Sequence, residues 1–484
     1  MKEFFVPHKD NDQPKYLQIA EGIKDLIRKK ILKKGEKLPS SRNLSQQFVC
    51  HRQTVTLAFD ELISGGWIYS EPRKGYFVNE VLPDELIPET VASVEEQHTF
   101  WSKQEFYSKV ELPSFHPETP IQYNFTSIVD DLRQFPIAEF RNCFNDSIML
   151  ASKQLLDYNS PQGWPFLVDM LTLYLRRFRA IKDRMVIVSN GSQEAIYYLM
   201  RMLLKPGDDV AIEAISYPPM FGLFKLLNSN VNLIQCDEQG IDPNHLENVL
   251  KTKKIKVLFL TPLHQFPTTI TLSSQRREAI KALASKYEFL ILEDDYDHEC
   301  SYFDKPPAPM ASDDPEGRVL YVSTFSKVMF PSARLGFMAI PQKLGQEICQ
   351  YKRIVNHQNS AIIQDATARW MQKGHFERHK NKLRKRCLSR LETVISELDS
   401  MNTNGSNLKW VKPNGGMGLW LNTGQDTDQL SKKALAQGVF VTPESYYRFD
   451  KKPGTHIRIG FSGHKEEELV SGLRILAALL QNPD

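Results

Sequence analysis

Seven short apolar segments, separated by stretches of helical periodicity, lie in the middle of the sequence. The first is MVIV at residues 185–188 and the last is GFMAI at residues 336–340; the five between them are DVAIE, NLIQC, KVLFL, FLILE and VLYVS. Apolar strands that alternate with amphipathic helices are typical of a mostly parallel sheet with helices on its faces. This pattern predicts a large α/β unit in this part of the chain.

The chain is long enough to hold more than this unit, because 484 residues exceed the size of an ordinary single domain. With 41% apolar and 25% charged residues, it has the composition of soluble globular proteins. It has no apolar run of the ~18 residues that a membrane span needs, and it starts without the apolar stretch and cleavage site of a secretory signal. We therefore expect a cytoplasmic protein that does not contact membranes.

The six cysteines lie far apart and form no CxxC pair. This spacing argues against a zinc site and against a disulfide framework, so we expect no bound metal. Free cysteines are most often small core residues, and buried thiols are expected at these six positions.

Charge is unevenly distributed over the first 120 residues. Between Lys24 and Lys74, eleven lysines and arginines face five acids, whereas Asn79 to Glu111 hold eight acids and two lysines. The acidic stretch also contains prolines and little apolar periodicity, as expected of an extended linker. We predict a basic N-terminal domain at residues 1–78, an acidic linker at 79–120 and a large C-terminal domain at 121–484.

The basic domain has the pattern of three helices followed by two strands, and it is expected to be of the α+β class. Ser40 or Ser41 can cap the second helix. The predicted helices lie at residues 14–30, around Leu44 and at 51–63, and the predicted strands of a wing lie at 67–69 and 76–78.

Polar and basic side chains of this domain can contact DNA. Two short helices joined by a tight turn can place the second one in the major groove, where Arg52 and Gln53 would bind base edges. Arg42 and Lys74 would neutralise phosphates or enter a minor groove. The alternative is that these charges only solvate the surface of a small helical domain.

Residues 35–78 resemble the GntR-type winged helix-turn-helix; they read GEKLPSSRNLSQQFVCHRQTVTLAFDELISGGWIYSEPRKGYFV. The resemblance implies that Arg42, Arg52, Thr54 and the wing around Gly75 contact double-stranded operator DNA. His51 stands where the family usually has the serine that caps the recognition helix.

The α/β unit lacks two common phosphate-binding loops, since no GxGxxG follows its first strand and no GxxxxGK[ST] occurs. The first strand leads instead into the turn Asn190-Gly191-Ser192-Gln193, which opens a helix and can present free backbone N–H groups to a phosphate. The alternative is ordinary helix capping.

Two further motifs follow later strands of this unit. A buried strand delivers Glu293-Asp294-Asp295-Tyr296 at its C-terminal end, where ligands gather in open α/β sheets, although such acids often only solvate a loop. Lys327 then lies between hydroxyls, with Arg334 seven residues further on. A lone lysine is usually a surface residue, but in this apolar stretch a lowered pKa and Schiff-base chemistry become possible.

Together these motifs resemble the fold-type I, aspartate-aminotransferase-like proteins that bind pyridoxal 5′-phosphate (PLP), over roughly residues 121–480. The matching positions occur in the family's order: Tyr158, Pro161, Gly163, Gly191, Ser192, Gln193, Tyr217, Asp294, Tyr296, Ser326, Lys327, Arg334, the segment 415–420, and Arg458 with Phe461. The resemblance implies a multidomain chain, with the winged helix-turn-helix joined to a large α/β PLP domain.

The family implies a role for each matching residue. Lys327 would bind PLP covalently, Asp294 would keep the pyridine nitrogen protonated, Tyr296 would bond the phenolic oxygen, and Tyr217 would stack on the ring. The phosphate would be held by Gly191, Ser192, Gln193, Thr324, Ser326 and Arg334. Arg458 would bind the α-carboxylate of an amino acid, although an internal salt bridge is the alternative for a buried arginine.

One departure from the family indicates a regulator. Phe266 stands where aminotransferases usually have the asparagine that supports the ring oxygen, in the segment TPLHQFPTT. This version, together with the run EDDYD, resembles the MocR branch of the GntR regulators, which fuse a winged helix-turn-helix to an aminotransferase-like domain. The resemblance implies a PLP-dependent transcriptional regulator that senses a small amine, an amino acid or the vitamer itself.

Two other functions stay open at this point. The chain could be a working aminotransferase with a DNA-binding head, or its large domain could be a scaffold for dimerisation without a cofactor. A homodimer is implied by resemblance, and it would present two heads to two DNA half-sites.

Overall fold

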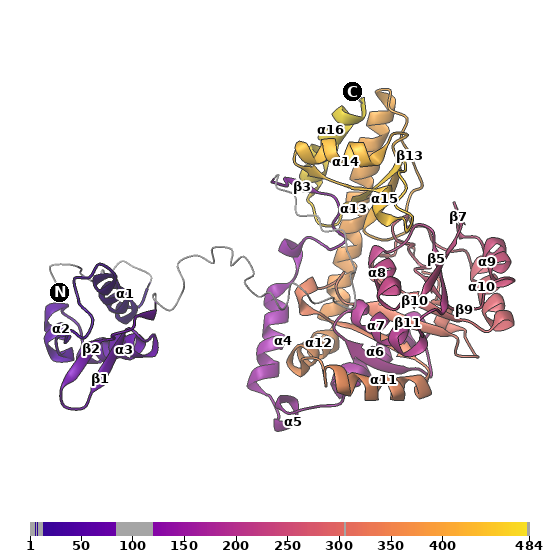
Figure 1. The fold of residues 1–484 in the computed structure, drawn as a ribbon. Coiled ribbons are helices and arrows are strands. Elements are labelled where there is room, and N and C mark those ends of the chain that lie inside the picture. The colour runs from indigo at the N-terminus through magenta and orange to yellow at the C-terminus, as the bar shows by residue number, and fades with distance from the viewer. Residues whose placement is uncertain (1–4, 6, 8–12, 84–119, 304–305, 482–484) are drawn as a thin grey trace, which may run out of the picture. The chain divides into compact units, whose positions relative to one another are not determined.

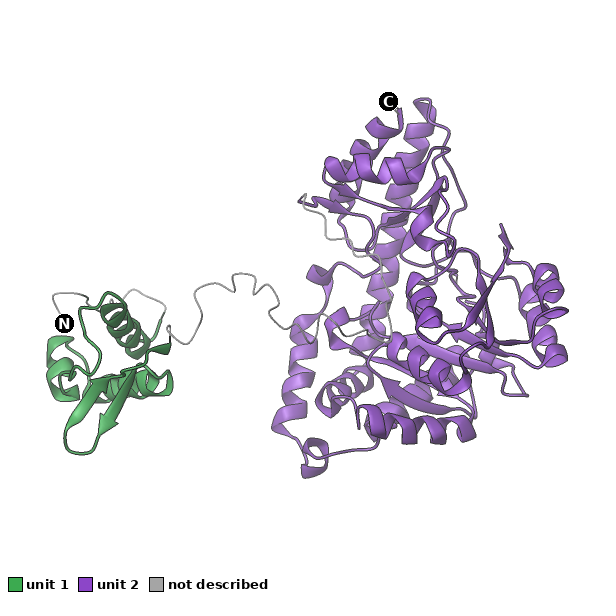
Figure 2. Cartoon of the chain, in the orientation of Figure 1, with its two compact units in different colours: residues 1–107 green, residues 108–484 purple. Residues whose placement is uncertain are grey.

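The computed structural model describes residues 5, 7, 13–83, 120–303 and 306–481. The chain forms two compact units, residues 1–107 and 108–484, which are coloured separately in Figure 2. Most of the predicted acidic linker, residues 84–119, lies outside the described residues. The domain boundaries at 78 and 120 therefore stay a prediction.

The described residues of the first unit form three helices and a two-stranded antiparallel wing, as the sequence predicts (Figure 1). The elements are α1 (Lys15–Arg28), α2 (Ser41–Gln47), α3 (Arg52–Ser64), β1 (Ile68–Glu71) and β2 (Gly75–Val78). Ser40 caps α2 by accepting a hydrogen bond from the backbone N–H of Asn43 at 3.2 Å. The Nδ1 atom of His51 caps α3 by accepting from the backbone N–H of Gln53 at 3.3 Å, so the histidine keeps the capping function of a serine.

The second unit is built on a seven-stranded sheet in the order β4-β12-β11-β10-β9-β5-β6. The strands are β4 (Met185–Ser189), β5 (Asp209–Glu213), β6 (Asn230–Ile234), β9 (Ile255–Leu260), β10 (Leu290–Asp294), β11 (Val319–Thr324) and β12 (Gly336–Ile340). Of the seven, only β12 runs antiparallel to its neighbours, so the predicted, mostly parallel sheet is confirmed. The segment NLIQC is shifted, because β6 ends at Ile234 and the chain then enters the hairpin β7 (Cys236–Asp237) and β8 (Gly240–Ile241).

Both faces of this sheet are buried, because alternate side chains of each strand enter different hydrophobic cores. In β12, Phe337 and Ala339 belong to one core, whereas Met338 and Ile340 belong to the other. The first core is covered by α6 (Pro165–Tyr174), α9 (Pro243–Leu250), α10 (Ser274–Tyr287) and α12 (Ala361–Gln372), and the second by α7 (Ser192–Leu203), α8 (Pro218–Leu226) and α11 (Gln342–Val355). Across the described residues, no helix combines the length and the apolarity that a membrane crossing requires.

The C-terminal part of this unit is a second, four-stranded sheet in the order β13-β14-β17-β16. The long helix α13 (His375–Thr403) leads to it from the large sheet (Figure 1). The strands are β13 (Lys409–Trp410), β14 (Gly418–Asn422), β16 (Thr442–Pro443) and β17 (His456–Gly460), and the helices are α14 (Thr427–Ala436), α15 (Glu444–Tyr447) and α16 (Glu466–Gln481). Earlier in the chain, β3 (Tyr123–Asn124) pairs in parallel with β15 (Val439–Phe440) and is followed by α4 (Ile137–Met149) and α5 (Lys153–Leu156).

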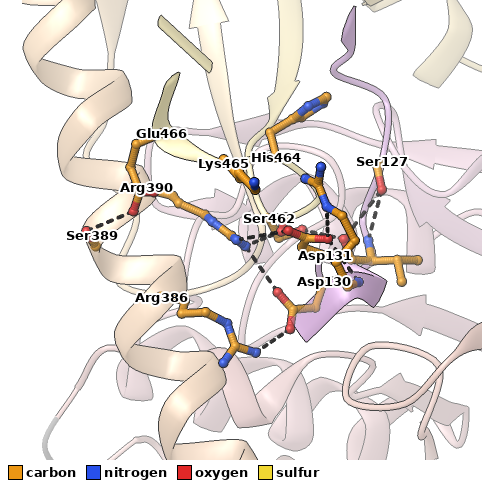
Figure 3. Close-up of polar contacts among 12 residues, drawn as sticks. Ser127, Asp130, Asp131, Arg386, Ser389, Arg390, Ser462, His464, Lys465 and Glu466 are labelled. Carbon is orange, nitrogen blue, oxygen red and sulfur yellow. Dashed lines mark hydrogen bonds and ion pairs between the residues drawn. The ribbon is translucent and has the colours of Figure 1, made fainter. Parts of the chain in front are cut away.

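Near the start of the described part of the second unit, the buried Asp130 belongs to an ion-pair cluster (Figure 3). The carboxylate of Asp130 pairs with Arg386 at 2.5 Å and with Arg390 at 3.1 Å, both on α13. Arg390 also donates to the backbone carbonyl of Ser462, whose hydroxyl donates to the carbonyl of Val129 at 2.9 Å. The cluster therefore joins residues 129–130 to both the long helix and the C-terminal sheet.

All six cysteines are free thiols, but the prediction that they are buried is wrong for three of them. Cys143, Cys300 and Cys387 are buried, Cys50 and Cys349 are partly exposed, and Cys236 is exposed. Cys236 lies on the short hairpin β7–β8, outside the large sheet to which its segment was assigned. Within the described ranges, no group of three or more His, Cys, Asp or Glu side chains is placed to hold a metal ion.

Candidate cofactor and DNA-contact sites

A cavity of about 220 Å³ lies at the carboxyl ends of β4, β9, β10 and β11. Its lining contains all ten residues predicted to bind the cofactor: Gly191, Ser192, Gln193, Tyr217, Asp294, Tyr296, Thr324, Ser326, Lys327 and Arg334. The other lining residues are Ile128, Val129, Thr261, Phe266 and Pro331. Ligands of open α/β sheets bind at this edge, so the cavity is the candidate cofactor site.

One corner of the cavity is suited to an anion. Helix α7 begins at Ser192, directly after Gly191, whose φ of +83° is left-handed. The first N–H groups of a helix have no partner inside the helix, so those of α7 can bind an anion. A Cβ atom on Gly191 would lie 3.1 Å from Nη2 of Arg334, so glycine allows the guanidinium to approach the turn. The hydroxyls of Thr324 and Ser326 lie 2.9 Å apart beside them. Helix amides, hydroxyls and a guanidinium together match a phosphate group.

The turn at residues 190–193 is supported by side chains that belong to none of the sequence motifs. Glu194 accepts hydrogen bonds from the backbone N–H of Asn190 at 2.6 Å and from the side-chain amides of Asn356 and Asn359 at 2.9 and 3.3 Å. The fully buried Lys352 donates to Asn359 and to two main-chain carbonyls. The members come from distant parts of the sequence, and no local motif could have revealed the network.

Asp294, at the end of β10, is 5% exposed. Burial raises the pKa of its carboxyl group to about 7, and the nearby Lys327 opposes this effect. Among the described residues, the Oδ1 atom of Asp294 has no hydrogen-bond partner although it is buried. A protonated ring nitrogen in the cavity would supply both the missing donor and a positive charge.

Lys327, which follows β11, is 9% exposed, and its Nζ atom lies 5.8 Å from the centre of the Tyr296 ring. Burial lowers the pKa of the amine to about 8; the charge of Arg458 acts in the same direction, whereas the carboxylates of Asp297 and Asp294 oppose it. A lysine with a lowered pKa offers more of the neutral amine that attacks an aldehyde.

Aromatic side chains form one wall of the cavity, with Phe266 in the middle. Its ring lies edge to face against Tyr217, Tyr296 and Tyr447, with centroid distances of 5.6, 5.9 and 5.7 Å. The backbone N–H of Phe266 donates to the hydroxyl of Thr261 at 2.9 Å. The side chain at this position therefore offers a ligand an apolar surface and no hydrogen-bond donor.

Arg458, on β17, is 1% exposed and packs against Phe266, with its guanidinium carbon 5.3 Å from the centre of the ring. It does not line the cavity itself. Gly418, on the neighbouring strand β14, leaves room for it, because a Cβ atom there would lie 2.4 Å from Nη2 of Arg458. In the part of the chain that the structure describes, Nε and Nη1 of Arg458 have no hydrogen-bond partner, and no internal salt bridge to this arginine is observed.

The six predicted DNA-contact residues lie on α2, α3 and the wing. Arg42, Arg52, Gln53 and Lys74 are exposed, and Thr54 and Gly75 are partly exposed. The Nε atom of Arg52 donates to the hydroxyl of Ser41 at 3.1 Å, which links the two helices, and Lys74 pairs with Glu71 at 2.8 Å across the wing turn. Gly75 has a φ of +121°, which a residue with a side chain rarely adopts. Their contacts with DNA stay a prediction.

A family model described as "Aminotransferase class I and II" matches residues 126–476, which is most of the chain. The chain belongs to the class I and II aminotransferase family. A second model, "Bacterial regulatory proteins, gntR family", matches residues 15–78, the helix-turn-helix unit with its wing. The predicted combination of a winged helix-turn-helix with a fold-type I aminotransferase domain is therefore confirmed.

Similar proteins include regulators and enzymes. The HTH-type transcriptional regulator YhdI of Bacillus subtilis is 27% identical and covers 97% of this chain and 96% of its own; the probable rhizopine catabolism regulatory protein MocR of Rhizobium meliloti is 25% identical and covers 97% and 94%. An uncharacterized aminotransferase of Saccharolobus solfataricus is 30% identical over 73% of this chain and 90% of its own. The solved structure of Pyrococcus horikoshii kynurenine aminotransferase has a TM-score of 0.71 and 26% identity, covering 76% of this chain and 92% of that one.

These findings support the predicted class of function. The chain is a MocR-like, GntR-type regulator with an aminotransferase-like unit, and its DNA-binding domain is the N-terminal one. PLP is its cofactor. This follows from its membership of the aminotransferase family and from its likeness to a structure that contains PMP, the amine form of PLP.

Proposed function

We propose that this regulator binds PLP in the cavity at the edge of the large sheet and uses it to sense a small amine or amino acid. When bound, PLP supplies an aldehyde that captures primary amines and a ring that withdraws electrons. Lys327 would hold the cofactor covalently, and Asp294 would pair with the ring nitrogen. Tyr296 would bond the phenolic oxygen and Tyr217 would stack on the ring.

The anion corner of the cavity would hold the phosphate. Its ligands are proposed to be Gly191, Ser192, Gln193, Thr324, Ser326 and Arg334. Arg334 would supply the positive charge, and the start of α7 would supply backbone donors. The unpartnered Oδ1 of Asp294 and this corner are the two features of the cavity that fit the two ends of PLP.

Arg458 is the observation that carries the effector proposal. A fully buried guanidinium without a carboxylate partner is costly, and a carboxylate ligand would relieve this cost through two parallel hydrogen bonds. Arg458 packs against the ring of Phe266, which lines the cavity. We therefore propose that the effector carries a carboxylate beside its amine, as an amino acid does.

On the DNA side, Arg52 and Gln53 are proposed to contact base edges, because they are exposed at the N-terminal end of α3. Thr54 would contact DNA from the same turn of the helix. Arg42 on α2 and Lys74 with Gly75 in the wing would contact phosphates or a minor groove.

A working aminotransferase with a DNA-binding head is the second candidate, because the cavity carries the lysine, the aspartate and the arginine that such enzymes use. The apolar Phe266 in place of a hydrogen-bond donor favours the regulator. Incubation with amino donors and keto acids tests the choice, with absorbance reporting the cofactor. A single conversion of bound PLP, or none, is expected; sustained turnover at ordinary enzyme rates would make the protein an enzyme.

We also propose that the regulator is a homodimer. Around α4 and α5, several large apolar side chains are strongly exposed: Met149, Leu150, Leu156 and Tyr158 at 81, 68, 65 and 82%. Large apolar side chains exposed in this number are typical of an interface, and the aminotransferase fold is typically dimeric. Sedimentation of the full chain tests this proposal: a dimer is expected, and a stable monomer would contradict it.

A further inference from the structure

Glu194, in the first turn of α7, receives hydrogen bonds on both oxygens of its carboxylate. Its Oε2 atom accepts from the backbone N–H of Asn190 at 2.6 Å and from Nδ2 of Asn359 at 3.3 Å. Its Oε1 atom accepts from Nδ2 of Asn190 at 3.0 Å, from Nδ2 of Asn356 at 2.9 Å and from the hydroxyl of Tyr198 at 3.3 Å. Glu194 does not line the cavity, and the proposed cofactor contacts do not include it.

The fully buried Lys352 fixes the direction of one of these donors. Its Nζ atom donates to three acceptors, Oδ1 of Asn359 at 2.6 Å and the main-chain carbonyls of Pro161 and Val188 at 2.8 and 2.5 Å. An ammonium group has only donors, so Asn359 must turn its oxygen to Lys352 and its NH2 group to Glu194. Val188 belongs to β4, which leads directly into the turn before α7. Lys352 therefore supports both this strand and the carboxylate of Glu194.

Glu194 reaches the anion corner of the cavity through Asn190. While Glu194 accepts from the N–H of Asn190, the carbonyl oxygen of Asn190 accepts from Nη2 of Arg334 at 2.6 Å. This carbonyl shares a planar peptide group with the N–H of Gly191, so the direction of one fixes the direction of the other. Gly191 and Arg334 both line the cavity and are two of the proposed phosphate ligands. The carboxylate of Glu194 thus orients ligands that it does not contact.

We propose that Glu194 is a positioning residue that makes the cavity selective for PLP over pyridoxal, the same aldehyde without its phosphate. This role rests on the proposed function, in which the anion corner holds the phosphate of PLP. A guanidinium and backbone N–H groups bind a phosphate more tightly when they are held in place before it arrives. Pyridoxal has the same ring and aldehyde as PLP but no group that uses this corner. Lys352, Asn356 and Asn359 act with Glu194, because they hold its carboxylate.

The test compares the affinities of the cofactor-free full chain for PLP and for pyridoxal, each titrated by the absorbance of the lysine-bound aldehyde. Glu194→Gln keeps the shape of the side chain but replaces one acceptor oxygen by an NH2 group. Each oxygen of Glu194 accepts at least two hydrogen bonds, so in either orientation the new NH2 group meets other donors.

The two affinities are expected to respond differently to Glu194→Gln. The affinity for PLP should fall about 10-fold or more, as for hydrogen-bonding groups that lose their partner inside a protein. The affinity for pyridoxal should change by less than about 3-fold, because pyridoxal does not use the oriented ligands.

Asp314→Asn is the matched control, because the carboxylate of Asp314 also holds a turn next to a strand. It accepts from the backbone N–H groups of Arg318 and Val319 at 3.0 and 2.8 Å, and from Nη2 of Arg184 at 2.7 Å. This turn precedes β11, whereas the cavity lies at the carboxyl end of that strand. Asp314→Asn should leave the ratio of the affinities for PLP and pyridoxal unchanged.

Asn356→Ala is a milder variant. Asn356 lies 162 residues beyond Glu194 in the sequence, and its substitution removes one of the hydrogen bonds to Glu194 but keeps the carboxylate. A smaller fall in the affinity for PLP, with an unchanged affinity for pyridoxal, is expected. If Glu194→Gln does not fold, the decision rests on Asn356→Ala.

Three results would overturn the role of Glu194: an unchanged affinity for PLP, equal falls in the affinities for PLP and pyridoxal, or the same change of their ratio in Asp314→Asn. Borohydride fixation of PLP in the wild-type chain separates these results from failure of the proposed function. Fixation at Lys327 together with any of the three refutes only the role of Glu194. Fixation at another lysine, or a wild-type chain that binds PLP no better than pyridoxal, refutes the proposed function itself.

Discussion

Replacement of Arg458 by methionine separates a ligand anchor from a structural ion pair. Methionine is unbranched and apolar, so it replaces the aliphatic part of the arginine side chain without a charge. If the guanidinium has no internal partner, its removal deletes no ion pair from the folded protein. The fold should then tolerate the substitution, and the effector should not.

The structure sets the expected magnitudes. Arg458→Met removes the contact of the guanidinium with the Phe266 ring, which is worth about 1 to 2 kcal/mol. It also removes the cost of a buried charge, which acts in the opposite direction. The free energy of unfolding should therefore change by less than about 2 kcal/mol in either direction. Loss of charge-assisted hydrogen bonds to a carboxylate costs about 1.5 to 3 kcal/mol, which corresponds to an affinity about 10- to 150-fold weaker for an amino-acid effector.

Arg390→Met is the matched control, because Arg390 is equally buried but paired. It contacts Asp130 at 3.1 Å and the carbonyl of Ser462 (Figure 3). Breaking a buried ion pair costs about 3 to 5 kcal/mol, so this variant should unfold much more easily than Arg458→Met. Denaturant unfolding without ligand measures the free energy of unfolding. The shift of cofactor absorbance on titration with amino acids measures the affinity for the effector.

Two results would show that Arg458 is not an effector anchor. A loss of stability in Arg458→Met as large as that in Arg390→Met would mean that Arg458 belongs to an internal ion pair. An unchanged response to the effector in a stable Arg458→Met would show that the effector needs no carboxylate anchor, as expected if the vitamer itself is sensed.

Three other predictions concern separate parts of the chain. Lys327→Ala should abolish the absorbance of lysine-bound PLP while near-UV circular dichroism shows that the fold is kept. Arg52→Ala should weaken specific DNA binding, measured by fluorescence anisotropy, by about 1 to 3 kcal/mol if the side chain binds a guanine. An equal loss of affinity on every DNA sequence, with a shallower salt dependence, would show that Arg52 contacts phosphate instead. Burial raises the carboxyl pKa of Glu213 to about 8, so the folded chain retains a proton that the unfolded chain releases near pH 4.5. The free energy of unfolding should therefore fall as pH rises between these two values. Urea unfolding of Glu213→Gln at several pH values should show the loss of part of this fall, on the order of 3 to 5 kcal/mol.

The sequence predicted the elements that have a strong local signal. All seven strands of the large sheet were found because each is an apolar segment whose two faces are buried in different cores. The three helices and the wing of the first unit were found from their periodicity and caps. The strand assigned as NLIQC was shifted, because Cys236 after Ile234 continues the apolar pattern although the chain has already left the sheet.

The motif-based residues of the site were predictable, whereas its supports were not. The ten cofactor residues line one cavity because they end or follow a strand, begin a helix or, for Arg334, precede the antiparallel β12 at the same edge of the sheet. Glu194 and Asn356 are 162 residues apart, and Asp130 and Arg390 are 260 apart, so each pair exists only after the chain has folded. A buried arginine in a short strand is equally compatible with a salt bridge and with a ligand anchor, and only the three-dimensional neighbours of Arg458 separate the two.

In the proposed function, the aminotransferase-like unit controls DNA binding through PLP and an amine effector. The most direct measurement is the affinity of the full chain for DNA fragments that it selects from a random pool, with and without PLP and with a panel of amino acids and amines. Compounds that shift the absorbance of bound PLP should also change the DNA affinity of the wild-type protein, and Lys327→Ala should show neither response. If the DNA affinity is the same with and without PLP, and with every compound that reacts with PLP, the aminotransferase-like unit does not control DNA binding in this way.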